Sequence, residues 1–267
     1  LPMISSTKND QVKMVVELRK KAKARNEAGL FVAEGVRMVS ELPPERAERL
    51  YVSESFLKNP ENAALLERFS RYEIVTDPVF SAMSDTQTPQ GILALAKQYE
   101  YGLPDLLSAP GPAHLMILEN LQDPGNLGTI LRAGEGAGVT GVIMSRDTVD
   151  IYNPKVVRST MGSAFRVPFL YTDDLPGTVR ELKAGGVRLF AAHLEGRNNY
   201  EEEDYTGNTG FLIGNEGNGL TEALSASADA WVKIPMAGRV ESLNAAVAAS
   251  ILMFETARQR RHGRCTK

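Results

Sequence analysis

Two short apolar segments in the C-terminal half of the chain each run into a polar, glycine-rich loop, and the second loop opens directly into a long apolar helix. The first reads FLIGNEGNGL from residue 211, and the second reads IPMAGRVESLN from residue 234. Glycines let the main chain approach a ligand closely or take dihedral angles that a side chain forbids. Ser242 and Asn244 stand at the start of the helix, where polar side chains cap it or reach into a pocket. The pattern predicts a small-molecule pocket built largely from backbone groups.

The other apolar segments predict an α/β fold in two parts. Residues 1–100 open with a basic amphipathic helix over 8–26 and then alternate short strands with helices. The proline- and glycine-containing stretch 101–112 reads as a linker. Beyond it, over 113–267, continuous apolar runs alternate with helical stretches, which is typical of parallel strands covered by helices on both faces. These runs are HLMILE, GVIMS, RVPFL, VRLFAA, GFLIG and WVKIP.

Composition and residue spacing exclude several classes of protein. No apolar run reaches the roughly 18 residues that a membrane-spanning helix needs, so we expect no membrane partner. The first residues lack a signal-peptide pattern, and the single Cys265 cannot form an internal disulfide, so we expect a cytoplasmic setting. His114, His193 and His262 are widely scattered, and no Cys/His pair has the spacing of metal ligands. We therefore expect no metal site.

Positive charge gathers near the two ends of the chain, although the formal net charge is −3. Residues 1–40 hold eight Lys and Arg against four acids, and the tail after Phe254 is also basic, including Arg264 and Lys267. Local basic patches bind phosphate backbones, whereas the alternative is that both are solvated helix faces. The candidate RNA contacts are Lys20, Lys21, Lys23, Arg25 and Arg37.

A third polar loop precedes a helix within residues 118–139, which read LENLQDPGNLGTILRAGEGAGV. The turn residues before Asn126 predict that the helix begins there or at Leu127. Asn126 and Arg132 are separated by about 600° of helical rotation, so they do not share a helix face. Taken alone, Asn126 reads as a helix cap and Arg132 as a surface charge. Glu216, between glycines after a strand, could hold a hydroxyl, an amine or a guanidinium, or could be a solvated acid in a tight turn.

Gly136, Gly138 and Gly141 fit the pattern GxGxxG of dinucleotide-binding proteins. That fingerprint requires a strand before it and a helix after it, whereas these glycines close a helix and precede a strand. They indicate a helix C-cap and an αβ loop. A nicotinamide-dependent oxidoreductase is therefore disfavoured.

The three polar segments, taken in order, resemble the motifs of the SpoU/TrmH family of RNA ribose 2′-O-methyltransferases, within the SPOUT superfamily. The resemblance covers about residues 113–258. The family motif N-x-G-x-x-x-R is matched by Asn126, Gly128 and Arg132. The motif G-x-E-G-x-G-[LM] is matched by Gly214, Glu216, Gly217, Gly219 and Leu220. The motif I-P-M-x-G-x-x-x-S-L-N is matched by Ile234, Pro235, Met236, Gly238, Ser242, Leu243 and Asn244.

The resemblance implies a deep trefoil knot formed by the last two loops and the final helix, and a homodimer with its active site at the subunit interface. It also implies that knot backbone groups bind S-adenosylmethionine. The matching cofactor positions are Gly214, Gly217, Ile234, Met236 and Leu243. The matching catalytic positions are Arg132, Asn126, Glu216, Ser242 and Asn244.

The first hundred residues resemble the ribosomal-protein-like α/β substrate-binding domain of many rRNA-directed members. The segments that carry this resemblance are FVAEGVRMV (31–39) and TPQGILALA (88–96). Ribosomal RNA is thus the favoured substrate. The alternatives are a tRNA 2′-O-methyltransferase and a non-catalytic RNA-binding protein of the same fold.

Methyl transfer to a ribose hydroxyl requires stabilisation or removal of a proton from a weakly acidic group. Family proposals make the arginine matched by Arg132 the base. A guanidinium is locked in its protonated form, so we expect Arg132 to stabilise developing oxyanion charge and to grip a phosphate. Asn126, Glu216, Ser242 and Asn244 are then expected to orient the arginine, the ribose and the cofactor.

Overall fold

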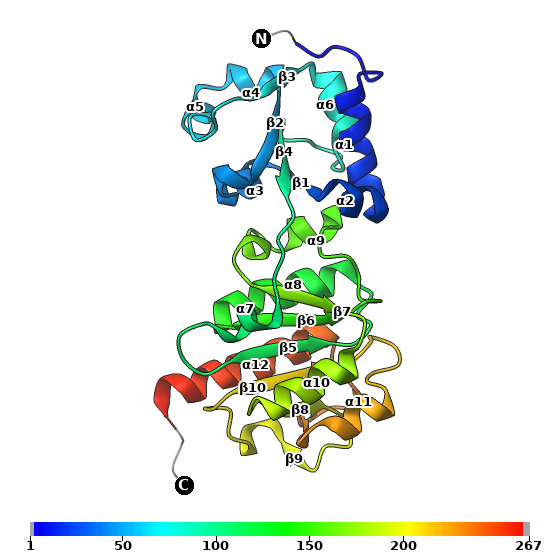
Figure 1. Ribbon diagram of the computed structural model, residues 1–267, viewed down its shortest axis with the longest axis vertical. Coiled ribbons are helices and arrows are strands. Elements are labelled where there is room, and N and C mark those ends of the chain that lie inside the picture. The colour runs from blue at the N-terminus through cyan, green and yellow to red at the C-terminus, as the bar shows by residue number, and fades with distance from the viewer. Residues whose placement is uncertain (1–2, 264–267) are drawn as a thin grey trace. The chain divides into compact units, whose positions relative to one another are not determined.

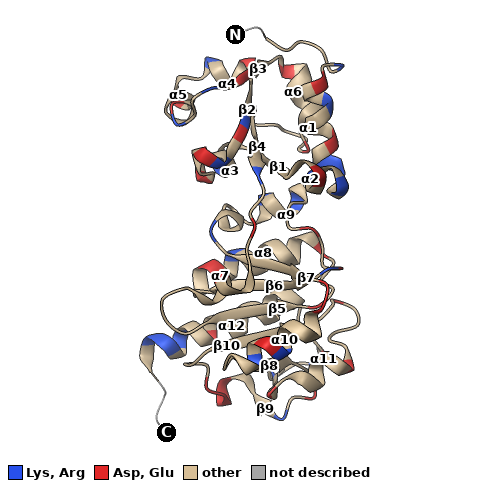
Figure 2. Cartoon of the chain, in the orientation of Figure 1, with Lys and Arg blue, Asp and Glu red and all other residues tan. Residues whose placement is uncertain are grey.

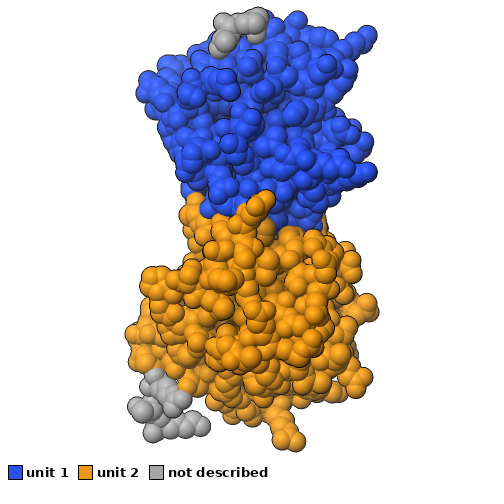
Figure 3. All heavy atoms as spheres, viewed as in Figure 1, with its two compact units in different colours: residues 1–99, 150–165 blue, residues 100–149, 166–267 orange. Residues whose placement is uncertain are grey.

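The computed structural model of the chain describes residues 3–263, which form two compact units (Figures 1 and 3). Of the described residues, the first unit contains 3–99 and 150–165, and the second contains 100–149 and 166–263. Residues 150–165, which the sequence places in the C-terminal domain over 113–267, pack with the first unit in the structure. Arg264, Cys265 and Lys267 of the predicted basic tail lie outside the described residues.

The first unit is built on a four-stranded sheet in the order β1-β4-β2-β3. The strands β1 and β2 each pair antiparallel with β4, and β2 pairs parallel with β3. The strands are β1 (Leu30–Glu34), β2 (Ala47–Ser53), β3 (Glu73–Val75) and β4 (Ile92–Lys97). The helices are α1 (Asp10–Lys20), α2 (Ala22–Ala28), α3 (Val36–Glu41), α4 (Glu54–Lys58), α5 (Ala63–Leu66), α6 (Asp77–Met83) and α9 (Pro154–Ser159). Short 3-10 helices lie at Pro44–Arg46, Pro60–Asn62 and Ser163–Phe165.

The predicted basic helix over 8–26 is two helices rather than one. Lys21 takes an extended conformation, with φ −121° and ψ 117°, which ends α1 and begins α2. An amphipathic helix here implies an apolar face of Val12, Val15, Val16 and Leu18; Val12, Val15 and Leu18 are buried in the core of the unit, and Val16 is half-buried. The periodicity identified the buried face, but it did not reveal the break.

Residues 150–165 complete the core of the first unit. The ring of Tyr152 stacks on Phe31 of β1, with 4.5 Å between ring centroids. The Arg25 side chain is buried and donates to Asp150 through Nε at 3.0 Å and Nη2 at 2.6 Å. It also donates to the Leu18 carbonyl at 2.7 Å. Arg25 was predicted as an RNA contact; its burial and its ion pair give it a structural role instead.

The second unit is built on a seven-stranded parallel sheet in the order β7-β6-β5-β10-β8-β11-β9, which confirms the predicted parallel α/β fold. The strands are β5 (His114–Leu118), β6 (Gly141–Ser145), β7 (Phe169–Thr172), β8 (Arg188–Ala192), β9 (Asn198–Asn199), β10 (Thr209–Ile213) and β11 (Ala230–Lys233). The helices are α7 (Leu103–Leu107), α8 (Pro124–Ala137), α10 (Leu175–Ala184), α11 (Glu222–Ser227) and α12 (Ala245–His262), with a 3-10 helix at Tyr200–Glu202. The two-residue strand β9 was not predicted, because it is too short to show a pattern.

The predicted linker 101–112 contains helix α7, whose Leu106 side chain is buried. A Cβ atom at Gly141 would lie 2.3 Å from Leu106 Cγ, so the start of β6 must be a glycine for α7 to pack there. Gly138 ends α8 with a φ of 77°. The GxGxxG pattern is therefore a C-cap and an αβ loop, as predicted.

The C-terminal helix α12 packs against α8 and is fixed at its far end by polar groups. The Arg260 guanidinium donates to the carbonyls of Pro112, Ala113 and Gly207 at 2.8–2.9 Å. Gln259 accepts from the Tyr205 backbone N–H at 2.8 Å. These bonds join the C-terminal end of α12 to segments far away in sequence and fix the position of that end.

The buried Arg25–Asp150 pair gives a test of the unit boundaries. We expect Arg25→Met to lower the free energy of unfolding by about 3 kcal/mol, because it leaves Asp150 uncompensated and removes the bond to Leu18. Urea unfolding followed by circular dichroism measures the change. The control is Lys23→Met on the same helix, where the side chain is 85% exposed and a change within about 0.5 kcal/mol is expected. Equal effects of the two substitutions would refute the structural role of Arg25.

Candidate active site

Three loops leave the carboxyl ends of β5, β10 and β11 in the second unit. The end of β10 is level with the end of β5, because Ile213 pairs with Leu118. In a parallel α/β sheet, ligands bind outside the carboxyl ends of the strands. The three motifs identified in the sequence lie at the ends of these three strands.

The loop after β10 is a tight, self-bonded turn. Asn215 and Gly219 exchange two backbone hydrogen bonds, at 2.9 and 3.1 Å. The Asn215 side chain accepts from the N–H groups of Gly217 and Asn218. A Cβ atom at Gly214 would lie 2.1 Å from the Gly219 carbonyl carbon, so only glycine fits there. The glycines close the turn, in addition to any contact with a ligand.

The Glu216 carboxylate binds the loop that follows β5. It accepts from the backbone N–H groups of Gln122 at 3.0 Å and Asp123 at 2.9 Å, and from Asn126 Nδ2 at 3.0 Å. Partial burial acts to raise the pKa of Glu216, but these hydrogen bonds outweigh it and the net pKa lies below the ordinary value. Glu216 is therefore an ionised acceptor at neutral pH. Glu216 stands exposed in a tight turn, as in the predicted alternative, but its carboxylate is bound to the loop after β5 rather than to solvent alone.

Asn126 links Glu216 to the third loop, which lies between β11 and α12. Its Oδ1 atom accepts from Asn244 Nδ2 at 2.9 Å. Asn244 is the N-cap of α12, and its Oδ1 atom accepts from the N–H groups of Ala246 and Val247. The result is a directed chain of hydrogen bonds from the N-terminus of α12, through two amides, to the Glu216 carboxylate. We call it the Glu216–Asn126–Asn244 chain, and it joins all three motifs.

The structure shows which of the neighbouring polar residues caps each of the two helices. Asp123, rather than Asn126, is the N-cap of α8, and its Oδ1 atom accepts from the Asn126 N–H at 2.8 Å. Asn244, rather than Ser242, caps α12. Ser242 is exposed and makes no hydrogen bond within the described residues. The side chain of Asn126 is consequently free of capping and takes part in the chain instead.

Arg132 is not brought to the Glu216–Asn126–Asn244 chain within one subunit. It lies on α8, six residues beyond Asn126, and its side chain is exposed. In the part of the chain that the structure describes, it makes no hydrogen bond or ion pair. A charged group presented without an internal partner is available to a ligand or to a second subunit.

The loop between β11 and α12 has backbone N–H and C=O groups without backbone partners among the described residues. Residues 235–243 make no backbone hydrogen bond to any described residue. Most of these residues are exposed, so their unpaired N–H and C=O groups are open to water or to a polar ligand. Of the predicted cofactor positions, Ile234, Met236 and Leu243 are half-buried in or beside this loop. These residues fit a polar nucleoside ligand held by main-chain groups.

Several residues at this edge were missed by the sequence analysis. Asn120 takes a positive φ of 54°, and its carbonyl accepts from Asn215 Nδ2 at 2.8 Å. Glu119 accepts from both the N–H and the hydroxyl of Thr221 at 2.8 Å. The available signal was the cluster of polar residues directly after the strand, since asparagine tolerates a positive φ better than other side chains do.

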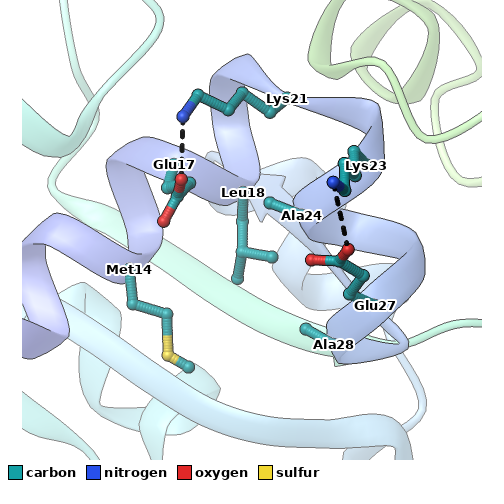
Figure 4. Close-up of a pocket in the computed structure, with 8 residues that line it drawn as sticks. All are labelled: Met14, Glu17, Leu18, Lys21, Lys23, Ala24, Glu27 and Ala28. Carbon is teal, nitrogen blue, oxygen red and sulfur yellow. Dashed lines mark hydrogen bonds and ion pairs between the residues drawn. The ribbon is translucent and has the colours of Figure 1, made fainter.

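The predicted RNA-contact cations on the first unit are mostly paired. Lys21 pairs with Glu17 at 2.9 Å and Lys23 with Glu27 at 3.7 Å along the rim of a surface hollow (Figures 2 and 4). Arg37 pairs with Glu41 at 3.4 Å. Within residues 3–263, Lys20 is the member of the predicted set without an ion pair. The acids reduce the positive potential that the sequence suggested for α1 and α2.

Among the described residues, no group of three or more His, Cys, Asp or Glu side chains could hold a metal ion. None of the described helices has the length and apolar character needed to span a membrane.

Comparisons with known proteins confirm the predicted family resemblance. The family model described as the SpoU rRNA Methylase family matches residues 113–254, and the MRM3-like substrate binding domain matches residues 9–94. The 23S rRNA (guanosine(2553)-2′-O)-methyltransferase RlmP of Bacillus subtilis is 33% identical over 256 residues, covering 95% of this chain and 98% of that protein.

Solved structures are similar over nearly the whole chain. The SpoU methyltransferase AviRb from Streptomyces viridochromogenes, in complex with the cofactor AdoMet, has a TM-score of 0.86 and 28% identity, covering 96% of this chain and 100% of that chain. The AdoMet-bound rRNA methyltransferase from Sinorhizobium meliloti has a TM-score of 0.82 and 32% identity, covering 98% of each chain.

The lowered pKa of Glu216 predicts a pH-dependent stability. A carboxyl group whose pKa is lower in the folded chain than in the unfolded chain stabilises the fold above the unfolded value, about 4.3. That contribution is lost as the pH falls through the folded value. We expect Glu216→Gln to lower the melting temperature at pH 7 by about 3 °C, and the difference from the unaltered chain to shrink in acid.

Thermal scans from pH 7 down to about pH 3 measure this, with the exposed Glu222→Gln as a matched control. A difference that stays constant across the range, or that is equal in the control, would contradict the binding of Glu216 to the α8 loop.

Proposed function

The chain belongs to the SpoU rRNA methylase family, and we propose that it is an S-adenosylmethionine-dependent methyltransferase that methylates a ribose 2′-hydroxyl in ribosomal RNA. The observation that carries the proposal is the Glu216–Asn126–Asn244 chain, which joins the three family motifs into one site. Two findings about relatives support the proposal. RlmP is named as a 23S rRNA methyltransferase, and two similar structures contain AdoMet.

The cofactor is held, in this proposal, by the loops after β10 and β11. Its contacts come from Gly214, Gly217, Ile234, Met236 and Leu243. When bound, it supplies an electrophilic sulfonium methyl group. The free backbone groups of residues 235–243 and the glycine turn that follows β10 support this placement. Glu216 acts through Asn126 and Asn244 as a positioning residue, which fixes the distance between the two loops.

Arg132 has the catalytic role in the proposal, acting on the active site of a second subunit. A protonated guanidinium stabilises charge on the attacking ribose oxygen and binds the adjacent phosphate. Two observations support a homodimer: Arg132 is exposed without an internal partner, and apolar Val247 and Phe254 on the adjoining α12 are 47% and 46% exposed. In this proposal Ser242, which is exposed in the loop after β11, orients the ribose.

A trefoil knot and the RNA contacts complete the proposal. The knot would be formed by the loops after β10 and β11 and by α12, and the long-range bonds of Arg260 support it. The RNA backbone would be contacted by exposed cations of the first unit, namely Lys20, Lys21, Lys23 and Arg37. Among the described residues, Lys20 makes no ion pair. Because ribosomal RNA is the substrate, we place the protein in the cytoplasm.

The test of the proposed function is methyl transfer from radiolabelled AdoMet to purified ribosomal RNA and, in parallel, to transfer RNA. We expect label in ribosomal RNA at a single 2′-O position, mapped by resistance to alkaline cleavage. Label confined to transfer RNA would change the substrate class. AdoMet binding without transfer to either RNA would refute the enzymatic proposal.

Replacement of Arg132 separates catalysis from cofactor binding. We expect Arg132→Ala to lower the rate constant of methyl transfer by about 10²–10³-fold and to leave AdoMet affinity unchanged, because the residue does not touch the cofactor loops. Arg132→Lys keeps the charge but loses the planar donor pair, so a large loss is expected again. Single-turnover kinetics and calorimetry measure the two quantities. Near-full activity of the lysine variant would exclude a guanidinium-specific role.

A further inference from the structure

The first unit contains a hollow of its own, with a volume of about 560 Å³. It is lined by the start of α3, the carboxyl end of β2, helices α4 and α6, and the loop before β4. The two segments that carried the resemblance of this unit, 31–39 and 88–96, meet at its wall. There the Val36 N–H donates to Gln90 Oε1 at 2.8 Å.

The wall of this hollow is closely fitted. Gly91 has a φ of 84°, and a Cβ atom there would lie 2.5 Å from Ser53 Oγ and 3.0 Å from Phe56 Cβ. The loop that carries Gln90 therefore packs closely against the end of β2. A side chain at position 91 would push this loop away from the strand. Buried Phe56 and Phe80 supply the apolar part of the lining.

Asp77 supplies the only charge among the side chains that line the hollow. Its carboxylate accepts from the Ser55 hydroxyl at 2.6 Å and from the Ser55 backbone N–H at 3.1 Å. These bonds lower the pKa of Asp77, so it is ionised at neutral pH. A carboxylate has about four lone-pair sites, so Asp77 keeps acceptor capacity for a ligand beyond its bonds to Ser55. Because no Lys or Arg lines the hollow, a phosphate group does not suit it.

Two amide groups supply hydrogen-bond donors to the same hollow. Gln90 uses its carbonyl oxygen on Val36, and Asn59 uses its carbonyl oxygen on the Glu61 N–H at 3.1 Å. The NH₂ group of each has no acceptor among residues 3–263. The hollow thus presents an anionic acceptor together with neutral donors.

This pattern complements one nucleobase better than the others. The Watson–Crick edge of guanine carries two adjacent donors, N1–H and the 2-amino group, beside the acceptor O6. A carboxylate binds both donors, and an amide NH₂ binds O6. Adenine and cytosine offer one donor group next to acceptors, and uracil offers one imino donor between two acceptors.

We propose that this hollow binds an unpaired guanine base of the RNA substrate, with Asp77 accepting from N1–H and the 2-amino group and with Gln90 or Asn59 donating to O6. The inference rests on the proposed function, in which the substrate is RNA. It adds a base-reading subsite to a unit whose exposed cations are proposed to contact the RNA backbone, since sequence specificity comes from contacts to base edges.

The test uses the full chain and short, labelled single-stranded RNAs that differ only in the central base of an adenosine run. We expect a central guanosine to bind about tenfold more tightly than a central adenosine. Asp77→Asn replaces one acceptor with a donor, which opposes the 2-amino group of guanine and matches the 2-oxo group of xanthine. We therefore expect this variant to lose the preference for guanosine and to bind the xanthosine oligonucleotide best.

Two further variants keep the test decisive. Ser81→Phe, at an exposed position on α6 that lines the hollow, fills the space without touching the Asp77–Ser55 bonds and should reduce guanosine binding to the level of adenosine. Glu45→Gln removes the same charge from an exposed site outside the hollow and should change nothing. Equal binding of all oligonucleotides, or an unaltered guanosine preference in both hollow variants, would overturn the inference.

The assay of methyl transfer distinguishes this failure from that of the proposed function. A chain that methylates ribosomal RNA but shows no guanosine preference refutes the base subsite alone. A chain that transfers no methyl group refutes the proposed function, while a guanosine preference that Asp77→Asn redirects to xanthosine still supports the hollow as a base subsite.

Discussion

The active-site edge depends on one carboxylate that serves as an anchor. Glu216 leaves a tight glycine turn and collects two main-chain N–H groups and one side-chain amide from the loop that opens α8. Without it, the side-chain hydrogen bonds between the loop after β5 and the segment after β10, within the described part of the chain, would be those of Asn120 with Asn215 and of Glu119 with Thr221. Bonds to an ionised acceptor are stronger than bonds between neutral groups, and several donors share this one. The relative placement of the loops follows from this convergence.

The direction of the hydrogen bonds gives the arrangement its specificity. Asn126 donates to Glu216 and accepts from Asn244, and Asn244 in turn accepts from the first turn of α12. An aspartate at position 126 would place two carboxylates against each other, and an aliphatic residue would break the chain at its centre. An amide that both donates and accepts is the residue type that the position requires.

The sequence was sufficient to predict the parallel sheet, the three motif loops and the order of the elements, because apolar runs bounded by glycine and asparagine have a clear physical meaning. It could not show which neighbouring polar residue caps each helix, since Asp123 and Asn126, or Ser242 and Asn244, are equally able to do so. It also could not show that Arg25 is buried. A basic residue in a charged helix is usually exposed, and its partner Asp150 is 125 positions away.

The segment 150–165 has a consequence for how this protein can be divided. A fragment that ends near residue 100 would keep all four strands of the first sheet, yet it would expose the face of Phe31 that Tyr152 covers and leave the Arg25 guanidinium without a counter-charge. The polypeptide enters the first unit twice, so the two units are interleaved in sequence rather than joined end to end. Genetic exchange of the N-terminal module between relatives would therefore have to transfer both pieces together, or adapt one to the other.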